Sequence, residues 1–180
     1  MPKKTTASRK STIQTEIRQS RPFRSVAQEA TVALLRTSSV VSRALSRVVE
    51  PSGLSLAQYN ALRIVRGAGA GGIPTLAIRE RMIEEGTTIT RLLDKLESAG
   101  FIRRERSFPD RRQVICYAKD AGKALLDRLD PLVDASDAEA MNGLSDDRLE
   151  LLIELLDEVR ANNAQRGAAR SAPTRGNGSP

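Results

Sequence analysis

Residues 87–112 read "TTITRLLDKLESAGFIRRERSFPDRR", and this stretch decides the fold. Its first half places apolar side chains at the three- and four-residue steps of a helix with one buried face: Ile89, Leu92, Leu93 and Leu96. Gly100 is typical of the residue that ends a helix. Two β-prone segments follow, at about 101–106 and 113–117, and Pro109 lies in the turn between them. The stretch therefore predicts a helix followed directly by a β-hairpin.

The same periodicity predicts five more helices, at about 23–49, 55–66, 74–83, 120–141 and 145–160. Ser55 and Gln58 form a capping box at the start of the second of these. Aromatic residues make up only 3% of the chain, so the core is built from Leu, Ile, Val and Ala, which favours helices. Residues 51–119 follow the order helix, short helix, turn, helix and hairpin, which is that of a winged helix-turn-helix. We therefore expect a mainly α fold of six helices with a small β-hairpin wing.

The formal charge of +7 is unevenly distributed along the chain. Residues 1–24 carry a net +6 and residues 79–123 a net +3, whereas residues 124–160 carry a net −8. A polyanion would be attracted to the N-terminal segment and the arginine cluster, and repelled by the acidic segment. Double-stranded DNA is the polyanion that a winged helix-turn-helix binds, so we expect DNA as the partner.

The two ends of the chain differ from the middle in composition. Residues 1–22 and 163–180 contain few apolar residues and many Ser, Thr, Arg, Lys or Gly residues. Such segments bury too little apolar surface to offset the entropy of ordering. We expect both to be disordered, the first as a basic tail that either adds contacts to DNA phosphates or serves solubility alone.

The helix and the hairpin both carry side chains suited to DNA. A helix face with small polar residues at its leading end fits the major groove, and an arginine-bearing hairpin fits a narrow minor groove. The candidate DNA-binding residues are Thr87, Thr88, Thr90, Arg91 and Lys95 on the helix, and Arg103, Arg104, Arg106, Arg111 and Arg112 on the hairpin. Two alternatives stay open: the threonines could be capping residues, and Arg91 could be an internal brace.

Three segments of the chain resemble the MarR family of bacterial transcriptional regulators. They are "LSLAQYNALRIV" at 54–65, "TTITRLLDKLESAGFIRRE" at 87–105 and "PDRRQVICYAKDAGKAL" at 109–125. The resemblance covers roughly residues 23–160. It implies an interleaved homodimer in which residues 23–50 and 120–162 form the helical dimerisation region, with the winged domain at 51–119 projecting from it. It also implies a repressor that binds a palindromic operator.

The resemblance further assigns roles within the wing and to an effector. It implies that Arg111 enters the minor groove at the wing tip, while Arg112 pairs with Asp94 or Asp110 to brace the hairpin. An effector, usually a small aromatic or phenolic carboxylate, would bind between the dimerisation region and the winged domain. Arg43 and Tyr59 are the candidate residues for that pocket.

Several other classes of function are disfavoured by the residues. The chain has no histidine, so Ser-His, Cys-His and His-metal sites are excluded, and we expect neither an enzyme, nor a metal site, nor a cofactor. The spacing of Gly67, Gly69 and Gly72 matches a dinucleotide motif, but these glycines follow a predicted helix instead of a strand. No apolar run is long enough for a membrane span. We expect a cytoplasmic, nucleoid-associated bacterial protein.

Two alternative functions remain compatible with the sequence. The chain could be a basic architectural protein that binds DNA without sequence preference or effector. It could also be a redox-responsive regulator, because Cys116 lies on the second wing strand near basic residues that favour a thiolate. The simpler interpretation of Cys116 is a small buried apolar residue.

Overall fold

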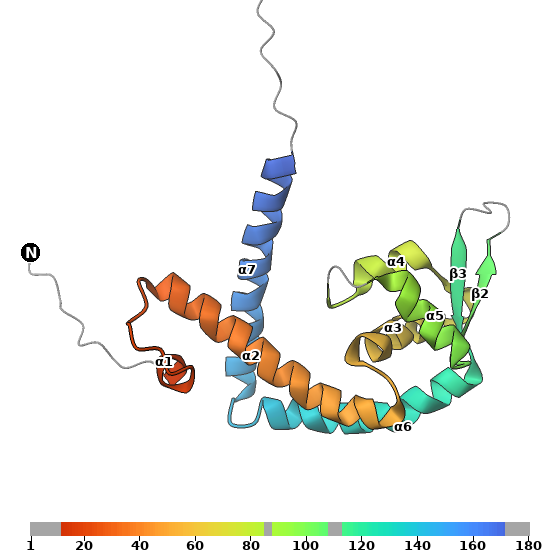
Figure 1. Cartoon of the computed structure of the whole chain (residues 1–180), viewed down its shortest axis with the longest axis horizontal. Helices are drawn as coiled ribbons and strands as arrows, with labels where there is room; N and C mark the ends of the chain where they lie inside the picture. The colour runs from red at the N-terminus through yellow and green to blue at the C-terminus, as the bar shows by residue number, and fades with distance from the viewer. Residues whose placement is uncertain (1–11, 85–87, 108–112, 172–180) are drawn as a thin grey trace, which may run out of the picture. The chain divides into compact units, whose positions relative to one another are not determined.

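The computed structural model describes residues 12–84, 88–107 and 113–171, with side chains to residue 164. The chain divides into two compact units, Met1–Ala140 and Met141–Pro180. The helices and strands of the first unit are α1 (Thr12–Glu16), α2 (Val26–Val49), α3 (Leu56–Gly67), β1 (Ile73–Pro74), α4 (Thr75–Arg81), α5 (Ile89–Ser98), β2 (Ile102–Arg106), β3 (Val114–Ala118) and α6 (Asp120–Ala140) (Figure 1). The described part of the second unit contains α7 (Asp146–Ser171).

Helices α2 and α3 begin at serine caps. At the start of α2 the hydroxyl of Ser25 accepts a hydrogen bond of 3.1 Å from the backbone N–H of Gln28. At the start of α3 the predicted capping box is present, because Ser55 and Gln58 each accept a hydrogen bond from the backbone N–H of the other. These caps fix where the two helices start.

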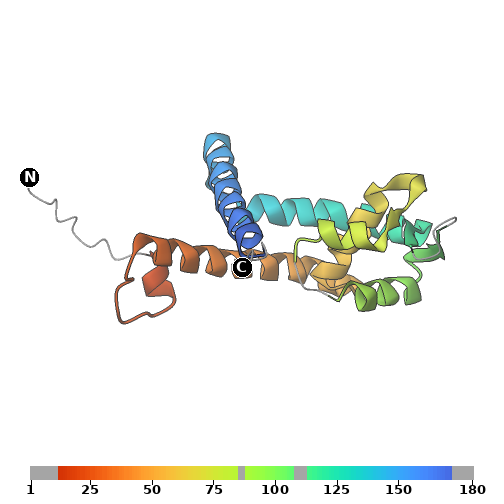
Figure 2. The same ribbon diagram turned by 90° about the horizontal axis from the view of Figure 1, so that it is seen from above.

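The core of the first unit lies among α3, α5, α6 and the sheet. Figures 1 and 2 show α3, α4 and α5 gathered at one end of this unit beside the hairpin. The fully buried side chains at its centre are Leu62 and Val65 of α3, Leu93 and Leu96 of α5, Ile102 of β2, Cys116 of β3 and Leu126 of α6. Because the apolar stripe of α5 is used in this core, its opposite, polar face is left to solvent.

The sheet has three strands in the order β1-β3-β2, so the predicted hairpin gains one strand. Arg104 of β2 is paired in register with Cys116 of β3, and Cys116 also faces Ile73 of β1. Side chains directly opposite each other point to the same face of a sheet, so Arg104 and Cys116 share the face that meets α5. The strand β1 is only two residues long, too short for an alternating pattern to reveal it in the sequence.

The start of α6 packs against the end of the α5–β2 turn through a glycine. A Cβ atom on Gly122 would lie 2.3 Å from the carbonyl oxygen of Phe101, which is closer than real Cβ contacts come. The same carbonyl oxygen accepts a hydrogen bond of 2.9 Å from the backbone N–H of Lys119. Gly122 therefore lets α6 leave the hairpin at close range, and α6 then packs along α2.

The expected disorder of the two ends is wrong in part. Within residues 1–22, Thr12–Glu16 form α1, and Glu16 accepts a hydrogen bond of 2.6 Å from Arg36 of α2. Within residues 163–180, α7 continues to Ser171, because its alanine, glutamine and arginine residues extend a helix that is already formed. The helices described therefore number seven, one more than expected.

Candidate nucleic-acid interface

Helix α5 presents a polar face to solvent at one end of the first unit. Its apolar side chains Leu93 and Leu96 are 0% exposed, whereas the side chains predicted to contact DNA are exposed: Thr88, Thr90, Arg91 and Lys95. Thr88 is the N-cap of α5, and its hydroxyl makes no capping hydrogen bond. The backbone N–H groups at this helix start suit a DNA phosphate. Thr87 lies outside the described residues.

The hairpin of β2 and β3 lies beside α5 in Figure 1. Its two strands are joined near the turn by a 2.9 Å hydrogen bond from the backbone N–H of Ser107 to the carbonyl oxygen of Gln113. Arg106, the last residue of β2, is exposed. The predicted tip residues Asp110, Arg111 and Arg112 lie outside the described residues.

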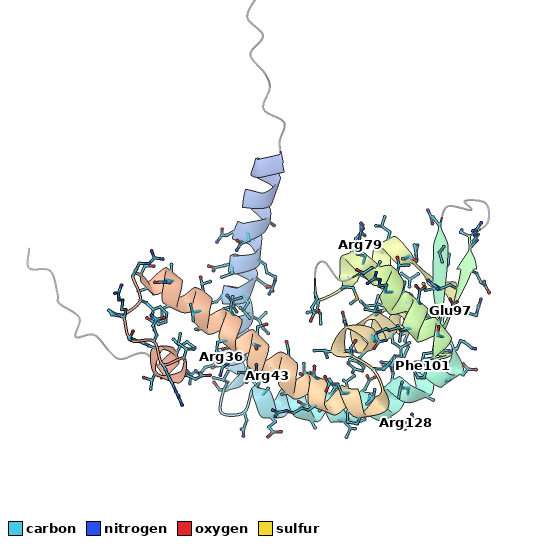
Figure 3. All side chains as sticks on the ribbon, viewed as in Figure 1. Arg36, Arg43, Arg79, Glu97, Phe101 and Arg128 are labelled. Carbon is cyan, nitrogen blue, oxygen red and sulfur yellow. The ribbon has the colours of Figure 1, made fainter. Side chains whose placement is uncertain are left out.

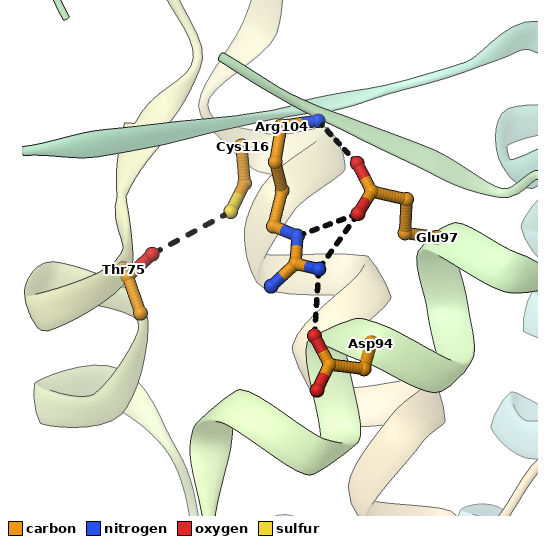
Figure 4. Close-up of polar contacts among 5 residues, drawn as sticks. All are labelled: Thr75, Asp94, Glu97, Arg104 and Cys116. Carbon is orange, nitrogen blue, oxygen red and sulfur yellow. Dashed lines mark hydrogen bonds and ion pairs between the residues drawn. The ribbon is translucent and has the colours of Figure 1, made fainter. Parts of the chain in front are cut away.

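Arg104 joins the hairpin to α5 (Figure 4). Its Nε and Nη2 atoms donate to Glu97 Oε2 at 2.8 and 2.7 Å, and Nη2 also donates to Asp94 Oδ1 at 2.6 Å. The backbone N–H of Arg104 donates to Glu97 Oε1 at 2.9 Å. One carboxylate of α5 thus binds both the guanidinium and the main chain of β2.

The charges of this cluster reinforce one another. Hydrogen bonding from Arg104 lowers the pKa of the Glu97 carboxyl, and hydrogen bonding to Glu97 raises the pKa of the Arg104 guanidinium. Charge-assisted hydrogen bonds of this kind are shorter and stronger than neutral hydrogen bonds. Arg104, predicted as a DNA contact, is therefore engaged inside the protein. Asp94 accepts a hydrogen bond from Arg104, whereas Arg112, which was predicted to pair with Asp94 or Asp110, lies outside the described residues.

Arg103 lies on the opposite face of the hairpin. Its guanidinium lies 4.0 Å from the centroid of the Tyr117 ring, its partner across the strands, and it forms an ion pair with Glu105. Of the three predicted arginines on β2, Arg106 is the one that forms no ion pair with any residue the structure describes. It is therefore the β2 arginine whose charge is most available to a ligand.

Comparison with known proteins places this arrangement in a family. A model described as the MarR family matches residues 54–114, from just before α3 to the first residue of β3. The crystal structure of a MarR transcription factor from Planctomyces limnophilus is 34% identical, covers 76% of this chain and 98% of that chain, and superposes with a TM-score of 0.59. The chain belongs to the MarR family.

Two further relatives agree with this MarR assignment. The transcriptional regulator PecS from Dickeya dadantii is 35% identical over 97 residues, which is 53% of this chain and 58% of PecS, so the match spans little more than half of that relative. A mutant MarR from E. coli, solved in complex with operator DNA, is 24% identical and covers 71% of this chain and 90% of that one, with a TM-score of 0.65. At that identity the similarity shows the fold alone.

The residues expected to hold an effector have other surroundings in this MarR fold. Tyr59 of α3 is 3% exposed, and its hydroxyl donates to Asp130 Oδ1 of α6 at 2.9 Å. Arg66 donates to the other oxygen of Asp130 at 2.5 Å. Burial, together with the Asp130 carboxylate, raises the pKa of Tyr59 to about 12. Tyr59 therefore ties α3 to α6, while Arg43 is exposed on α2 and bonds to Ser39.

A cavity of about 650 Å³ lies between α4, the start of α5 and the hairpin. Its walls combine apolar side chains such as Ile89 and Val114 with the polar residues Thr75, Thr90 and Arg104. Neither Arg43 nor Tyr59 lines it. An apolar recess with a few polar groups is the usual form of a small-molecule site.

Cys116 has the environment of a core residue. It is 0% exposed, and its sulfur lies 3.8 Å from the hydroxyl oxygen of Thr75. Burial raises the pKa of its thiol, whereas sensor cysteines are exposed and have a lowered pKa. The basic residues near Cys116 do not overcome this burial, so the thiolate of the redox alternative is disfavoured and Cys116 fits the simpler interpretation of a small buried residue.

Three charged residues of this region were not predicted from the sequence, and Figure 3 labels two of them, Arg79 and Glu97. Arg79 and Arg81 are exposed on α4, the helix that precedes α5. Glu97 was given no role of its own, although it holds Arg104. The basic excess of residues 79–123 was the available signal for the two arginines.

Two other kinds of site are absent from the described residues. They contain no group of three or more His, Cys, Asp or Glu side chains that could hold a metal ion. Nor does any helix among them have the length and apolarity needed to cross a bilayer.

Proposed function

We propose that this chain regulates transcription by binding a palindromic operator as a homodimer, and that it acts as a repressor. The observation that carries the proposal is that α5 and the hairpin, the two elements of a winged helix-turn-helix that reach DNA, are held together by the Arg104 cluster. A surface that contacts the major and the minor groove at the same time needs α5 and the hairpin at a fixed relative position. The mutant MarR solved with operator DNA supports the same partner for this fold.

The contacts divide between the two grooves. The exposed face of α5 enters the major groove and offers small hydroxyls and two cations there: Thr88, Thr90, Arg91 and Lys95. Arg106 neutralises a phosphate beside the hairpin, and Arg111 at the tip enters the minor groove, where narrow segments concentrate negative potential. Arg111→Ala is expected to weaken operator binding severely while leaving the dimer intact.

A second copy of the chain is the proposed partner of the exposed apolar helix faces. On α2, Leu35 and Val40 are 66% and 45% exposed, and on α7, Ile153 and Leu155 are 58% and 51% exposed. Burying one such side chain contributes about 1.5–3 kcal/mol, and single chains in water rarely expose many of them together. A two-fold dimer would present two α5 helices to successive major grooves, about 34–36 Å apart.

The proposed effector is a small aromatic carboxylate, bound in the cavity beside α5. The apolar walls suit an aromatic ring, and the exposed side chain of Arg79 suits a carboxylate. DNA binding by BpsR from Bordetella bronchiseptica, a similar solved structure that is 17% identical, is regulated by 6-hydroxynicotinic acid, an aromatic carboxylic acid, which supports this class. CouR from Rhodococcus jostii, 23% identical, is bound to p-coumaroyl-CoA, whose carboxyl is a thioester, so it supports the aromatic ring alone. Because Thr90 of α5 lines this cavity, a bound effector would favour conformations in which the two α5 helices no longer match the spacing of the operator.

Selection from random duplexes, followed by competition, tests the DNA function. The selected duplex should be palindromic, and it should compete at least about a thousand times better than a shuffled duplex of the same composition. A ratio near one would leave only binding without sequence preference, and would overturn the proposal.

The effector is tested separately with a panel of hydroxybenzoates and hydroxycinnamates. A compound that raises the melting temperature of the free protein and releases it from the selected duplex would be the expected class. If no member of the panel does both, the effector assignment is wrong, while the DNA function still stands on its own test.

A further inference from the structure

Arg104 is placed between the two elements that the proposed function assigns to DNA. It is the third residue of β2, and its side chain is only 23% exposed. Every hydrogen bond it makes to a described side chain goes to α5, through Glu97 near the end of that helix and Asp94 one turn earlier. Figure 4 shows the guanidinium lying over α5, with the two carboxylates on the helix side.

Arg106 provides the internal comparison. It lies two residues further along β2, so its side chain projects from the same face as Arg104. It is exposed and has no ion pair within the part of the chain that the structure describes. Two arginines of one strand face thus have different environments: one is held by α5, and the other is open to a ligand.

A small change at Arg104 would be amplified at the turn. A strand rises about 3.3 Å per residue, so Ser107 lies about 10 Å beyond Arg104, and a rotation of about 10° there displaces Ser107 by about 2 Å. Hydrogen bonds to DNA require donor–acceptor distances of about 2.7–3.2 Å. Loss of the hydrogen bonds from Arg104 to Glu97 and Asp94 would therefore break contacts between the hairpin and DNA without removing any DNA-binding side chain.

We propose that Arg104 is a positioning residue, which fixes the angle between the hairpin and α5 through Glu97 and Asp94 and makes no contact with DNA itself. The inference rests on the proposed function, because it concerns how the same surface reads an operator. It assigns Arg104 a role opposite to the one expected from the arginine cluster alone. Specificity, more than electrostatic attraction, is the property it should control.

The salt dependence of operator binding separates positioning from direct contact. An arginine that neutralises a phosphate contributes about one unit to the slope of log K against log salt concentration. Arg104→Gln should lower affinity for the selected duplex about tenfold and leave this slope unchanged. Arg106→Gln, the matched control on the same strand face, should lower the slope by about one.

Two variants that each remove a carboxylate add a second test. A positioning role and a purely electrostatic role predict opposite changes in DNA affinity for one of them. Glu97→Ala and Glu105→Ala each remove one negative charge from the region, which by electrostatics alone should strengthen DNA binding. Glu105→Ala is expected to follow this rule. Glu97→Ala is expected to weaken binding to the selected duplex about tenfold while binding to a shuffled duplex is kept or strengthened, and it should speed hydrogen exchange at the Arg104 amide in the free protein.

The outcomes distinguish this inference from the proposed function. If wild-type protein prefers the selected duplex but Arg104→Gln lowers the salt slope as Arg106→Gln does, Arg104 touches a phosphate and the inference alone is overturned. It is also overturned if Glu97→Ala and Glu105→Ala behave alike. If the wild-type protein shows no preference for any duplex, the proposed function fails and the positioning role fails with it. Circular dichroism of each variant confirms that it is folded.

Discussion

Replacing Gly122 with alanine would place a methyl carbon 2.3 Å from the carbonyl oxygen of Phe101 and 3.2 Å from a methyl carbon of Leu62. The nearer atom belongs to the backbone, so it cannot rotate away as the end of a flexible side chain can. Either α6 must move off the start of β2, or the carbonyl must turn. If it turns, its 2.9 Å hydrogen bond from the Lys119 N–H is weakened.

The magnitude follows from three opposing effects. Overpacking of a tight contact costs about 1–3 kcal/mol, and a weakened backbone hydrogen bond about 0.5–1.5 kcal/mol. Alanine gains about 1 kcal/mol over glycine inside a helix. We therefore expect Gly122→Ala to lower the free energy of unfolding by about 1–3 kcal/mol.

Urea unfolding followed by circular dichroism measures this change, at one protein concentration because dimerisation would make stability depend on it. Gly67→Ala is the matched control: Gly67 lies in α3, and a Cβ atom there would meet nothing within 4 Å. That variant should be as stable as the wild type or slightly more so. If Gly122→Ala is as stable as Gly67→Ala, the close packing of α6 on Phe101 does not exist in solution.

Three further predictions test other parts of the structure. The pKa of Tyr59 is about 12 in the folded chain and about 10 in the unfolded chain, so the stability it contributes is complete below pH 10 and falls by about 3 kcal/mol between pH 10 and 12. Tyr59→Phe should remove this loss from the stability measured by unfolding at alkaline pH. A variant whose stability falls with pH as steeply as that of the wild type would contradict the prediction. Cys116, being fully buried, should react with a thiol reagent only on unfolding, and Cys116→Ser should leave any peroxide response of DNA binding unaltered; fast labelling of the native protein would restore the redox alternative. Leu35→Asp on α2 should yield folded monomers in sedimentation experiments, whereas a persistent dimer would place the interface elsewhere.

Local signals made the framework of the fold predictable. The capping box at Ser55 and Gln58 and the apolar stripe of α5 are properties of neighbouring residues, and both are present as expected. The strand pair after Gly100 follows from composition and turn residues in the same way. The two-residue strand β1 carries no such signal, because it exists only through its pairing with β3.

The roles of individual polar side chains depended on contacts between distant residues. Tyr59 was a candidate ligand residue, but its hydroxyl is bound by Asp130, which lies 71 residues away in the sequence. Arg103, Arg104 and Arg106 of β2 were all predicted to contact DNA, because each carries the same charge on the same strand. Arg104 differs from Arg106 because the turn after α5 brings Glu97 beside β2, where it binds Arg104.

Methylation protection of the selected duplex tests most directly whether α5 and the hairpin read DNA as a symmetric pair. Dimethyl sulfate methylates guanine N7 in the major groove and adenine N3 in the minor groove, so one reagent reports on both elements. We predict two patches of protected guanines with centres about one helical turn apart, each flanked by protected adenines on its outer side. A single patch, or guanines that stay fully reactive in the saturated complex, would contradict the account.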